Sequence, residues 1–474
     1  LPPVVLAASS PAKKYLGRDA FDIAGVTAQV DSGAEDDRVS LLDLQYRMAP
    51  AIAAVVSRLS YQGRLRSAEG AGRPSGVIPI ADPWAGQSVL FVDTSDLGPV
   101  CIPDPRPGSY SRANLLHAFF ALHLTGELQK GGVAEIALTT PYRAQSRLVN
   151  ALLGKPRSDE PVRAATIHRF QGSERDVVLV DLTDAPPAKG PSQLTDRNPD
   201  LARRLLNVAM SRARWKLIVL GPFDFLLRRA SLNGPLREVL GLFQEHGSRW
   251  RPQAAELAGA RSGELEWLGD WTASAQRIAA ELDLAESGLI VNWPGGLPAL
   301  PDVVSALRRA CSRVGSASKI FAPLPLAREF EETPAEIRLM ERPVGFFAQV
   351  AADRLIFGGT EAHHLFGMVR GKDSVAAALA FLHPEGEVGV KVDAQAQHAL
   401  DSRCGRCTEC GDFRRPRPVA GGAWALACKN RRHGEMPIDA AEFAALISLL
   451  GPRCSQCQGS LKLRQRKSGQ VWLA

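Results

Sequence analysis

Three short blocks between residues 41 and 214 carry the side chains best suited to chemistry on a nucleotide. They read LQYRMAP at 44–50, FQGSERD at 170–176 and RRLLNVAMSRAR at 203–214. Their arginines, glutamate and glycine turn are groups that can grip a nucleoside triphosphate from one side. A phosphate-cradling loop of the form Gly-x4-Gly-Lys-Ser/Thr does not occur in the 474 residues. The blocks therefore predict one half of a nucleotide site.

Residue types within these blocks suggest separate tasks. Gly172, in a turn between two expected strands, allows the backbone to approach a ligand closely, and Glu174 can accept a ribose hydroxyl. Arg212 can extend its guanidinium towards a phosphate held on a neighbouring domain, as an arginine finger does. Each block alone is a weak signal, because an arginine-rich helix is usually a solvated face.

Another polar segment, TPYRAQ at 140–145, follows an expected strand. It offers a hydroxyl, a helix N-terminus and an aromatic ring, which suit phosphate oxygens and a stacked base. Ligands of parallel α/β sheets gather at the carboxyl ends of the strands. The segment is therefore placed where a ligand is expected.

The pattern of apolar residues predicts a sheet that positions these blocks. Short apolar runs predict strands at 88–93, 136–139, 162–167, 177–180 and 217–220. Helical spacing predicts helices between them at 111–129, 143–153 and 202–214. Buried strands separated by helices indicate an α/β fold, with a parallel sheet covered on both faces.

At 231–268 a helix is expected, followed by a polar, glycine-containing segment that predicts a domain boundary. A second, smaller α/β region follows, with strands expected at 288–291, 319–321, 346–350 and 354–357 and helices at 273–284 and 374–382. Cys311 shares an apolar helical face with Val303 and Leu307, which predicts a core thiol and not a reactive one.

The segment 401–474 differs from the rest in charge and cysteine content. It holds 13 Lys/Arg against 6 Asp/Glu, a difference of +7 that equals the net charge of the whole chain. Such a basic tail suits a polyanion, or is simply a solvated terminal segment. Six of the 8 cysteines lie here, mostly in C-x-x-C spacing, which favours zinc over disulfides.

The tail supplies two sets of candidate zinc ligands. They are Cys404, Cys407, Cys410, Cys428 and His433, then Cys454 and Cys457. Cys404 and His433 compete to complete the first tetrahedral site. The second set resembles a topoisomerase-type zinc ribbon that is cut short at Ala474. Zinc either only holds the tail together or builds a nucleic-acid-binding ribbon with the nearby arginines.

In their order and separation, the blocks closely resemble the second RecA-like domain of superfamily-1 helicases, in the branch of the nonsense-mediated-decay helicase. The opening LPPVV resembles the stretch just after that family's third motif. Segments 41–50, 139–145, 166–176 and 203–214 resemble its later motifs. The resemblance covers roughly residues 1–225.

The resemblance implies roles for particular residues at an ATP–Mg²⁺ site. The nucleotide would contact Gln45, Tyr46 at the adenine, Arg47 at the terminal phosphates, Gly172 and Glu174 at the ribose-phosphate side, and the transition-state arginine Arg212. The P-loop lysine and the metal-binding acids would precede Leu1, so the chain alone is not expected to hydrolyse ATP.

The resemblance also implies a track for single-stranded RNA or DNA. Its contacts would be Thr139, Pro141, Tyr142, Thr166 and His168. His168 departs from the family, where a small or acidic residue is frequent. It is either a phosphate donor or a structural residue.

Residues 269–395 more faintly resemble a phospholipase-D-like domain, whose active form uses His-x-Lys-x4-Asp. Two registers of that motif fit here: Phe346, Ala348 and Asp353, or Gly345, Phe347 and Ala352. Neither supplies an imidazole nucleophile, and His363 and His364 lie too far downstream. We therefore expect an inactive domain that binds or scaffolds. Fusions of this kind resemble bacterial anti-phage systems such as the Mokosh type.

Four parts are expected: a RecA-like domain at 1–230, a helix and linker at 231–268, a phospholipase-D-like domain at 269–395 and a zinc-ribbon tail at 400–474. The predicted function is the C-terminal portion of an ATP-dependent RNA or DNA helicase. Alternatives are a non-enzymatic nucleic-acid adaptor, or a nuclease acting through the phospholipase-D-like domain. No run approaches the ~18 apolar residues of a membrane span, which predicts no membrane partner and a cytoplasmic protein.

Overall fold

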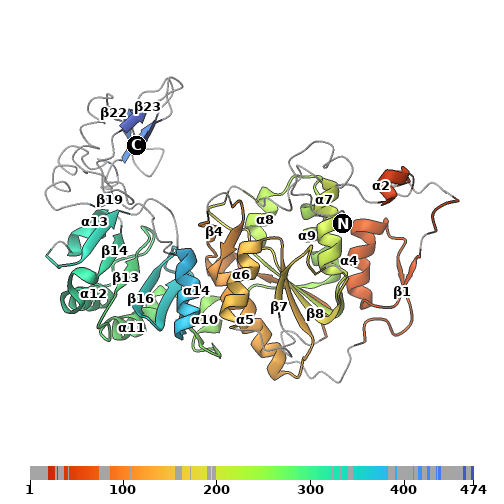
Figure 1. The fold of residues 1–474 in the computed structure, drawn as a ribbon, viewed down its shortest axis with the longest axis horizontal. Coiled ribbons are helices and arrows are strands. Elements are labelled where there is room, and N and C mark those ends of the chain that lie inside the picture. Colours follow the sequence, from red (N-terminus) through yellow and green to blue (C-terminus); the bar gives the residue numbers. More distant parts are fainter. Residues whose placement is uncertain are drawn as a thin grey trace. The chain divides into compact units, whose positions relative to one another are not determined.

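The computed structural model of the chain (Figure 1) divides into two compact units, Leu1–Trp267 and Leu268–Ala474. It describes residues 20–26, 29, 37–40, 42–73, 86–106, 109–154, 163–170, 172–188, 190, 194, 199–322, 324–330, 332–339, 345–382, 390–391, 409, 415–418, 424–427, 434, 436–438, 463–465 and 471–473. No helix in these ranges is long and apolar enough to cross a membrane.

The first unit is built on a parallel sheet with the strand order β10-β3-β9-β8-β6-β7. Its strands are β3 (Val89–Asp93), β6 (Ile136–Thr140), β7 (Arg163–Thr166), β8 (Arg175–Asp181), β9 (Ala213–Gly221) and β10 (Ser248–Trp250). The central strands are almost continuously buried, as expected for apolar runs covered on both faces. This confirms the predicted parallel-sheet α/β architecture, which fits a RecA-like domain.

Helices and short strands surround this sheet. The helices are α2 (Ala20–Ala24), α4 (Pro50–Tyr61), α5 (Leu115–Lys130), α6 (Arg143–Leu152), α7 (Pro199–Met210), α8 (Phe223–Arg229), α9 (Pro235–His246) and α10 (Ala254–Leu257), with a 3₁₀ turn at Ser95–Leu97. The short strands are β1 (Leu44–Gln45), β2 (Arg66–Ser67), β4 (Cys101–Pro103) and β5 (Arg112–Asn114). Near the end of this unit, β11 (Arg261–Ser262) pairs in antiparallel with β12 (Leu265–Gly269).

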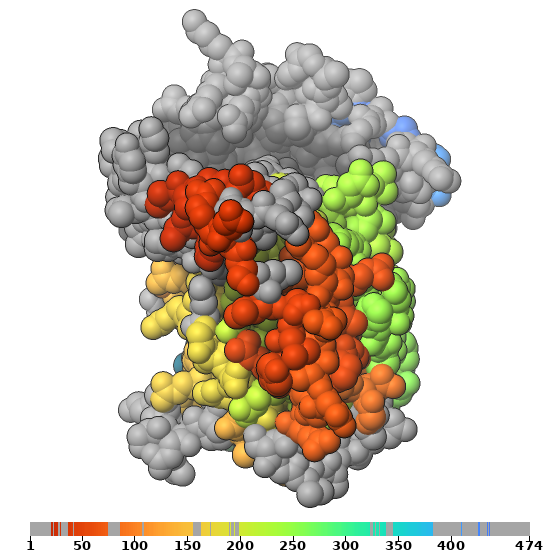
Figure 2. Space-filling model, turned by 90° about the vertical axis from the view of Figure 1, so that its right-hand side faces the viewer, coloured from red at the N-terminus to blue at the C-terminus, as the bar shows by residue number. Residues whose placement is uncertain are grey.

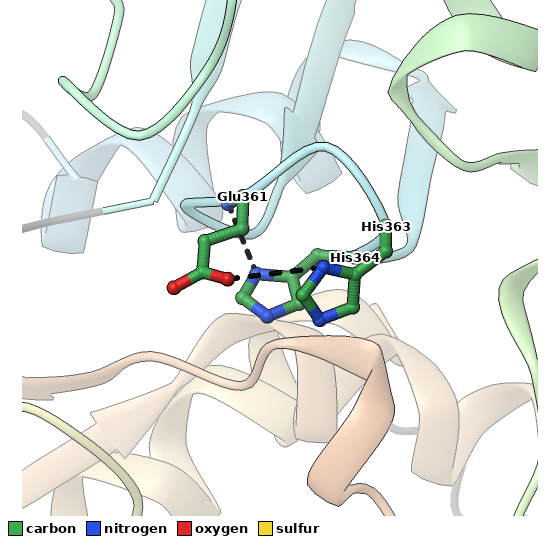
Figure 3. Close-up of side chains that lie close together, drawn as sticks. All are labelled: Glu361, His363 and His364. Carbon is green, nitrogen blue, oxygen red and sulfur yellow. Dashed lines mark hydrogen bonds and ion pairs between the residues drawn. The ribbon is translucent and has the colours of Figure 1, made fainter.

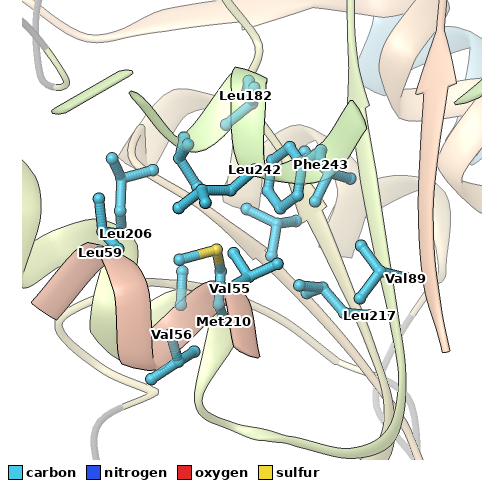
Figure 4. Close-up of a cluster of buried hydrophobic side chains, with 14 of the residues drawn as sticks. Val55, Val56, Leu59, Val89, Leu182, Leu206, Met210, Leu217, Leu242 and Phe243 are labelled. Atoms are coloured by element: carbon cyan, nitrogen blue, oxygen red, sulfur yellow. The ribbon is translucent and has the colours of Figure 1, made fainter. Parts of the chain in front are cut away.

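One core cluster packs α4, α7 and α9 against the sheet (Figure 4). Val55 of α4, Met210 of α7 and Phe243 of α9 meet beside Val89 and Leu217 of the strands. The core therefore fixes α4, and with it the segment just before α4, against the first residues of β9. That segment carries the first of the three sequence blocks.

Two expectations for the first unit need correction. The helix predicted at 202–214 ends at Met210, because Ala213 already pairs with Arg175 in the sheet. Arg212 consequently lies in a tight turn and not on a helix. The linker predicted at 231–268 contains β10, whose backbone pairs with β3 in parallel.

The second unit contains a mixed sheet. Seven of its strands follow the order β18-β17-β16-β13-β14-β15-β19. They are β13 (Ile290–Asn292), β14 (Lys319–Ala322), β15 (Glu336–Leu339), β16 (Phe347–Ala351), β17 (Arg354–Gly358), β18 (Phe366–Arg370) and β19 (Val390–Lys391). The strands β13, β14 and β15 pair in parallel, and the other pairs are antiparallel.

Helices of this unit are α11 (Trp271–Leu282), α12 (Pro301–Val314), α13 (Leu324–Ala327) and α14 (Lys372–Leu382), with 3₁₀ turns at Gly315–Ala317 and Arg328–Phe330. The ring of Trp271 lies 5.1 Å, between centroids, from each of Trp293, Phe346 and Phe366. Cys311 is fully buried in the same core, which confirms the predicted core thiol.

Short antiparallel strands are described in the tail. They are β20 (Arg415–Pro418), β21 (Trp424–Ala427) and β22 (Met436–Ile438) in one sheet, and β23 (Leu463–Gln465) with β24 (Val471–Leu473) in another. The predicted zinc ligands Cys404, Cys407, Cys410, Cys428, His433, Cys454 and Cys457 lie outside the described residues.

Candidate nucleotide and nucleic-acid site

Three residues predicted to contact the nucleotide converge at the amino edge of the parallel sheet. Glu174 immediately precedes β8 and Arg212 immediately precedes β9, and the amide of Arg175 donates to the carbonyl of Arg212 at 3.1 Å. Arg47 reaches both strands: its Nε donates to Glu174 Oε2, and its Nη1 to the carbonyl of Ser211 at 3.3 Å. Segments far apart in sequence thus meet at one edge.

A hydrogen-bonded turn holds Arg47 in place. Gln45 Oε1 accepts from the amides of Arg47 at 2.9 Å and Met48 at 2.6 Å, and its Nε2 donates to Ser67 Oγ at 2.7 Å. The amide of Ala49 donates to the carbonyl of Arg214 at 2.7 Å, which ties this turn to β9. The side-chain amide of Gln45, which was predicted to touch a nucleotide, is therefore used to hold Arg47 and Met48 in position.

An open hollow of about 410 Å³ lies over this edge, lined by Gln45, Tyr46, Arg47, Met48 and Glu174. The side chain of Tyr46 is 73% exposed, so its ring face is available for stacking. Figure 2 shows the corresponding side of the molecule, where the orange segment before and within α4 lies beside yellow and green parts of the same unit.

The guanidiniums of Arg47 and Arg212 lie close enough beside the hollow to influence each other's charge. Burial, and then the nearby charge of Arg47, lower the pKa of Arg212, because a second cation disfavours its protonated form. Its Nε donates only to the carbonyl of Val208, at 3.2 Å. Two neighbouring guanidiniums, one of which pairs with Glu174, are suited to an anionic ligand such as a triphosphate.

Sequence reasoning missed Arg214, which anchors the glutamate. Arg214 Nη1 lies 3.5 Å from Glu174 Oε1, and Nη2 lies 2.9 Å from Asp176 Oδ1 and also pairs with Glu135. Its position in the third block does not predict this role, because its carboxylate partners lie far from it in the sequence. Glu174 is consequently shared between Arg47 and Arg214.

Gly172 has a backbone conformation that favours glycine. Its φ of +91° lies in the region that favours glycine, but a Cβ there would meet no atom within 4 Å. Backbone conformation therefore favours glycine here, and the close approach to a ligand stays a prediction.

The carboxyl end of the sheet holds the residues predicted to face nucleic acid, and several are buried. Thr139 and Tyr142 are each 1% exposed, and Thr166 is 9% exposed. Tyr142 donates its hydroxyl to Asp184 Oδ2 at 2.6 Å, which removes it from the surface. Pro141 and His168 are partly exposed and remain available to a ligand.

A buried polar network explains why these side chains turn inward. Asp181 accepts from Gln145 Nε2 at 2.6 Å and from the amide of Thr183 at 2.7 Å, and lies 2.9 Å from His117 Nδ1. Burial raises the pKa of Asp184 to about 6, against the opposing effects of Tyr142 and the nearby Arg112. The network joins the end of β8 to α5 and α6.

In the second unit, Glu361, His363 and His364 bring three metal-ligating groups together (Figure 3). However, His364 Nδ1 accepts from the amides of Thr360 and Glu361, each at 3.1 Å. A neutral imidazole that accepts at Nδ1 carries its proton on Nε2 and offers no lone pair there. We therefore assign no metal to this cluster.

Core residues occupy several positions of the two proposed motif registers, whereas Ala352 is exposed and Asp353 is partly exposed. Phe346, Phe347 and Ala348 are at most 2% exposed, and Phe346 packs on Trp271. In both registers the place of the nucleophilic histidine is filled by a residue without an imidazole.

Comparisons with known proteins find a matching family model and similar curated proteins. A family model described as an AAA domain matches residues 27–224. The Regulator of nonsense transcripts 1 homolog of Neurospora crassa is 26% identical over 296 residues, which cover 56% of this chain and 25% of that protein. The DNA replication ATP-dependent helicase/nuclease DNA2 of Mus musculus is 28% identical over 215 residues, covering 41% of this chain and 20% of that protein.

A solved structure of the C-terminal domain of a possible DNA helicase from Lactobacillus plantarum is 15% identical, covers 41% of this chain and 94% of that domain, and has a TM-score of 0.22. That score is too low to carry an argument. The chain spans about a quarter or less of the two relatives' lengths. The family match and the relatives support the superfamily-1 helicase branch for this chain.

Proposed function

We propose that residues 42–230 form one wall of the ATP site of a nucleic-acid-dependent helicase or translocase. Arg47 and Arg212 bind and stabilise the phosphates, Tyr46 stacks on the base, and Glu174 contacts the ribose-phosphate side. The other wall is a second RecA-like domain with a phosphate-binding loop and the acids that hold Mg²⁺. Nucleic acid lies at the opposite end of the sheet, near Pro141 and His168.

The convergence of Arg47, Glu174 and Arg212 on one edge carries this proposal. These residues are separated by 127 positions and then 38, yet an ion pair and a strand register bring them together. A merely solvated arginine-rich face does not require such a meeting. The relatives, both named for ATP-dependent or transcript-directed activities, agree with it.

The arginine of the tight turn gives the decisive test. In the protein that includes the phosphate-loop domain, we expect Arg212→Ala to lower nucleic-acid-stimulated ATP turnover by about 10³-fold or more, because an arginine finger stabilises charge in the transition state. ATP binding, measured with a fluorescent analogue, changes little. Arg228→Ala is the matched control, since Arg228 is exposed on α8 of the same unit and lies outside the proposed site.

Turnover at the normal rate in Arg212→Ala would remove this residue from its role. A complete protein without any Gly-x4-Gly-Lys-Ser/Thr loop would contradict the motor proposal as a whole and favour a nucleic-acid adaptor. Oligonucleotide binding without ATP turnover in the unmodified protein would lead to the same conclusion.

For the tail, we propose one or two structural zinc ions held by the cysteine pairs named above. Their supply of thiolates in C-x-x-C spacing is the support. Elemental analysis of the purified chain is the measurement. Absence of zinc after preparation without chelators would contradict the assignment.

We further propose that residues 269–395 are a non-catalytic phospholipase-D-like scaffold, of the kind found in Mokosh-type anti-phage proteins. The apolar residues in both registers of the motif support it. Metal-independent cleavage of a phosphodiester substrate by the whole chain would contradict it.

A further inference from the structure

An exposed tyrosine lies among arginines at the carboxyl end of the first sheet, outside every sequence block discussed above. Tyr110 is 92% exposed, more than Tyr46 at 73%. Tyr110 lies between β4 and β5. Its neighbours Ser109 and Ser111 are both hydrogen-bonded to Asp104. A large aromatic ring that is exposed to solvent leaves its face open to stack on a base.

The backbone on both sides of Tyr110 is fixed by Asp104. This buried carboxylate accepts from Ser109 Oγ at 2.7 Å, from Arg106 Nη2 at 2.9 Å and from Arg147 Nη2 at 3.0 Å. Its amide also donates to the carbonyl of Ser111 at 2.9 Å. Burial alone would raise the pKa of Asp104, but hydrogen bonds from Arg106 and Ser109 and the charge of Arg147 lower it to about 2. The ring is therefore presented in a preset position.

The same pinning brings Tyr110 to the start of α6. The amide of Ala144 donates to Ser111 Oγ at 2.9 Å, so Tyr110 and Arg143 each lie one residue from a partner in this hydrogen bond. Arg143 is exposed and makes no ion pair with a described residue, and Arg147 follows one helical turn later. Three arginines against the single carboxylate of Asp104 leave a net charge of +2 by count.

We propose that Tyr110, Arg106, Arg143 and Arg147, here called the Tyr110 surface, bind single-stranded nucleic acid: the ring stacks on a base and the guanidiniums contact backbone phosphates. The proposal rests on the proposed function, because it extends the nucleic-acid end of the sheet beyond Pro141 and His168. The amide of Ile167 donates to the carbonyl of Thr140 at 3.1 Å, so the segment before His168 adjoins the strand that leads into α6. Both sets of residues thus lie at the same end.

The test measures fluorescence anisotropy of labelled 15-mers, oligo-dT and oligo-U, with the purified chain over a series of salt concentrations. We expect Tyr110→Ala to weaken binding by about 5- to 100-fold, the range for loss of one stacked base, and Tyr110→Phe to retain it. Arg143→Ala should reduce the slope of log K against log salt by about 1, because one phosphate contact is lost.

Matched controls use residues of the same unit that lie elsewhere. Leu232→Ala removes another exposed apolar side chain, 80% exposed, and Arg228→Ala removes another exposed arginine. Both should bind as the unmodified chain does. A photo-crosslink from a thiouridine-containing oligonucleotide to Tyr110, mapped by mass spectrometry, is the second measurement.

Wild-type affinity in Tyr110→Ala, or no detectable binding of either oligonucleotide by the unmodified chain, would overturn the inference. Failure of the motor proposal is distinguished by turnover, since Arg212→Ala reports on the amino edge and not on this surface. Preference for oligo-dT or oligo-U identifies the kind of strand, and either preference supports the inference.

Discussion

The two ends of the parallel sheet in the first unit are built on opposite principles. At the amino edge, charged side chains meet half in solvent, and the ion pair of Arg47 and Glu174 leaves each side chain 40% exposed. At the carboxyl end, Asp181 and Asp184 are buried and held by several donors each. An exposed pair can exchange its partner for a ligand at small cost, whereas a buried network fixes shape.

This difference assigns separate work to the two ends. The amino edge is suited to a ligand that binds and leaves, because its ion pair is partly exposed. The carboxyl end is suited to a fixed platform whose rim, including the Tyr110 surface, carries exposed cations. Substitutions at the two ends should therefore separate stability from activity.

The largest effect is expected at the buried end. Asp181→Ala would leave His117, Gln145 Nε2 and the amide of Thr183 without their common partner, and we expect a loss of about 3–5 kcal/mol in the free energy of unfolding. Urea denaturation measures it. Glu174→Ala is the matched control, because it removes a carboxylate at the amino edge. We expect it to lower the free energy of unfolding by less than about 1 kcal/mol. Equal losses at both sites would erase the proposed contrast.

The strands of both ends could be predicted from sequence, but the direction of their side chains could not. Continuous apolar runs such as Val177–Val180 fit only a doubly covered strand. Tyr142, in contrast, was predicted to face a ligand because it follows a strand. Its burial depends on Asp184, which lies 42 residues away and has no sequence signal that links it to Tyr142.

At the amino edge, local motifs identified Arg47, Glu174 and Arg212, while tertiary partners stayed hidden. Arg214 was missed because its role as the anchor of Glu174 arises from the register of β8 and β9. The helix predicted through Arg214 stopped early for the same reason, since strand pairing outweighed helical periodicity. The strand β10 was missed because three residues give too short a pattern.

The next effect concerns catalysis at the exposed edge. Arg47→Ala should lower ATP turnover by about 10²–10³-fold, as loss of one charge-stabilising donor does, and change the free energy of unfolding by less than about 1 kcal/mol. Steady-state ATPase assays and thermal melting of the same preparations measure both. Arg58→Ala removes an arginine from another exposed ion pair, with Glu245, and should leave turnover unchanged. If the Arg47→Ala variant is destabilised but turns over ATP at the normal rate, Arg47 has a structural role and not a catalytic one.

A smaller effect is expected from pH at the buried end. The pKa of Asp184 is raised from 3.8 to about 6 by burial, so the folded state favours its protonated form. Its contribution to stability is fully present below pH ~4 and is lost as pH rises through ~6, on the order of 3 kcal/mol. Urea unfolding between pH 4 and 7 should show this decline, and Asp184→Asn should flatten it. An unchanged slope in that variant would assign the decline to other groups.

The segment 167–174 joins the two ends, because it leaves the carboxyl end of β7 and returns to the amino end of β8. Gly172→Ala forces a Cβ into a left-handed backbone position and should cost about 1 kcal/mol in the free energy of unfolding. Gly132 is the matched control, because its φ is +89° and a Cβ there also meets open space. Both substitutions should therefore destabilise the chain equally. Only Gly172→Ala should also reduce ATP turnover, since a shift of its turn moves Glu174; equal turnover in the two variants would show that this crossover serves folding alone.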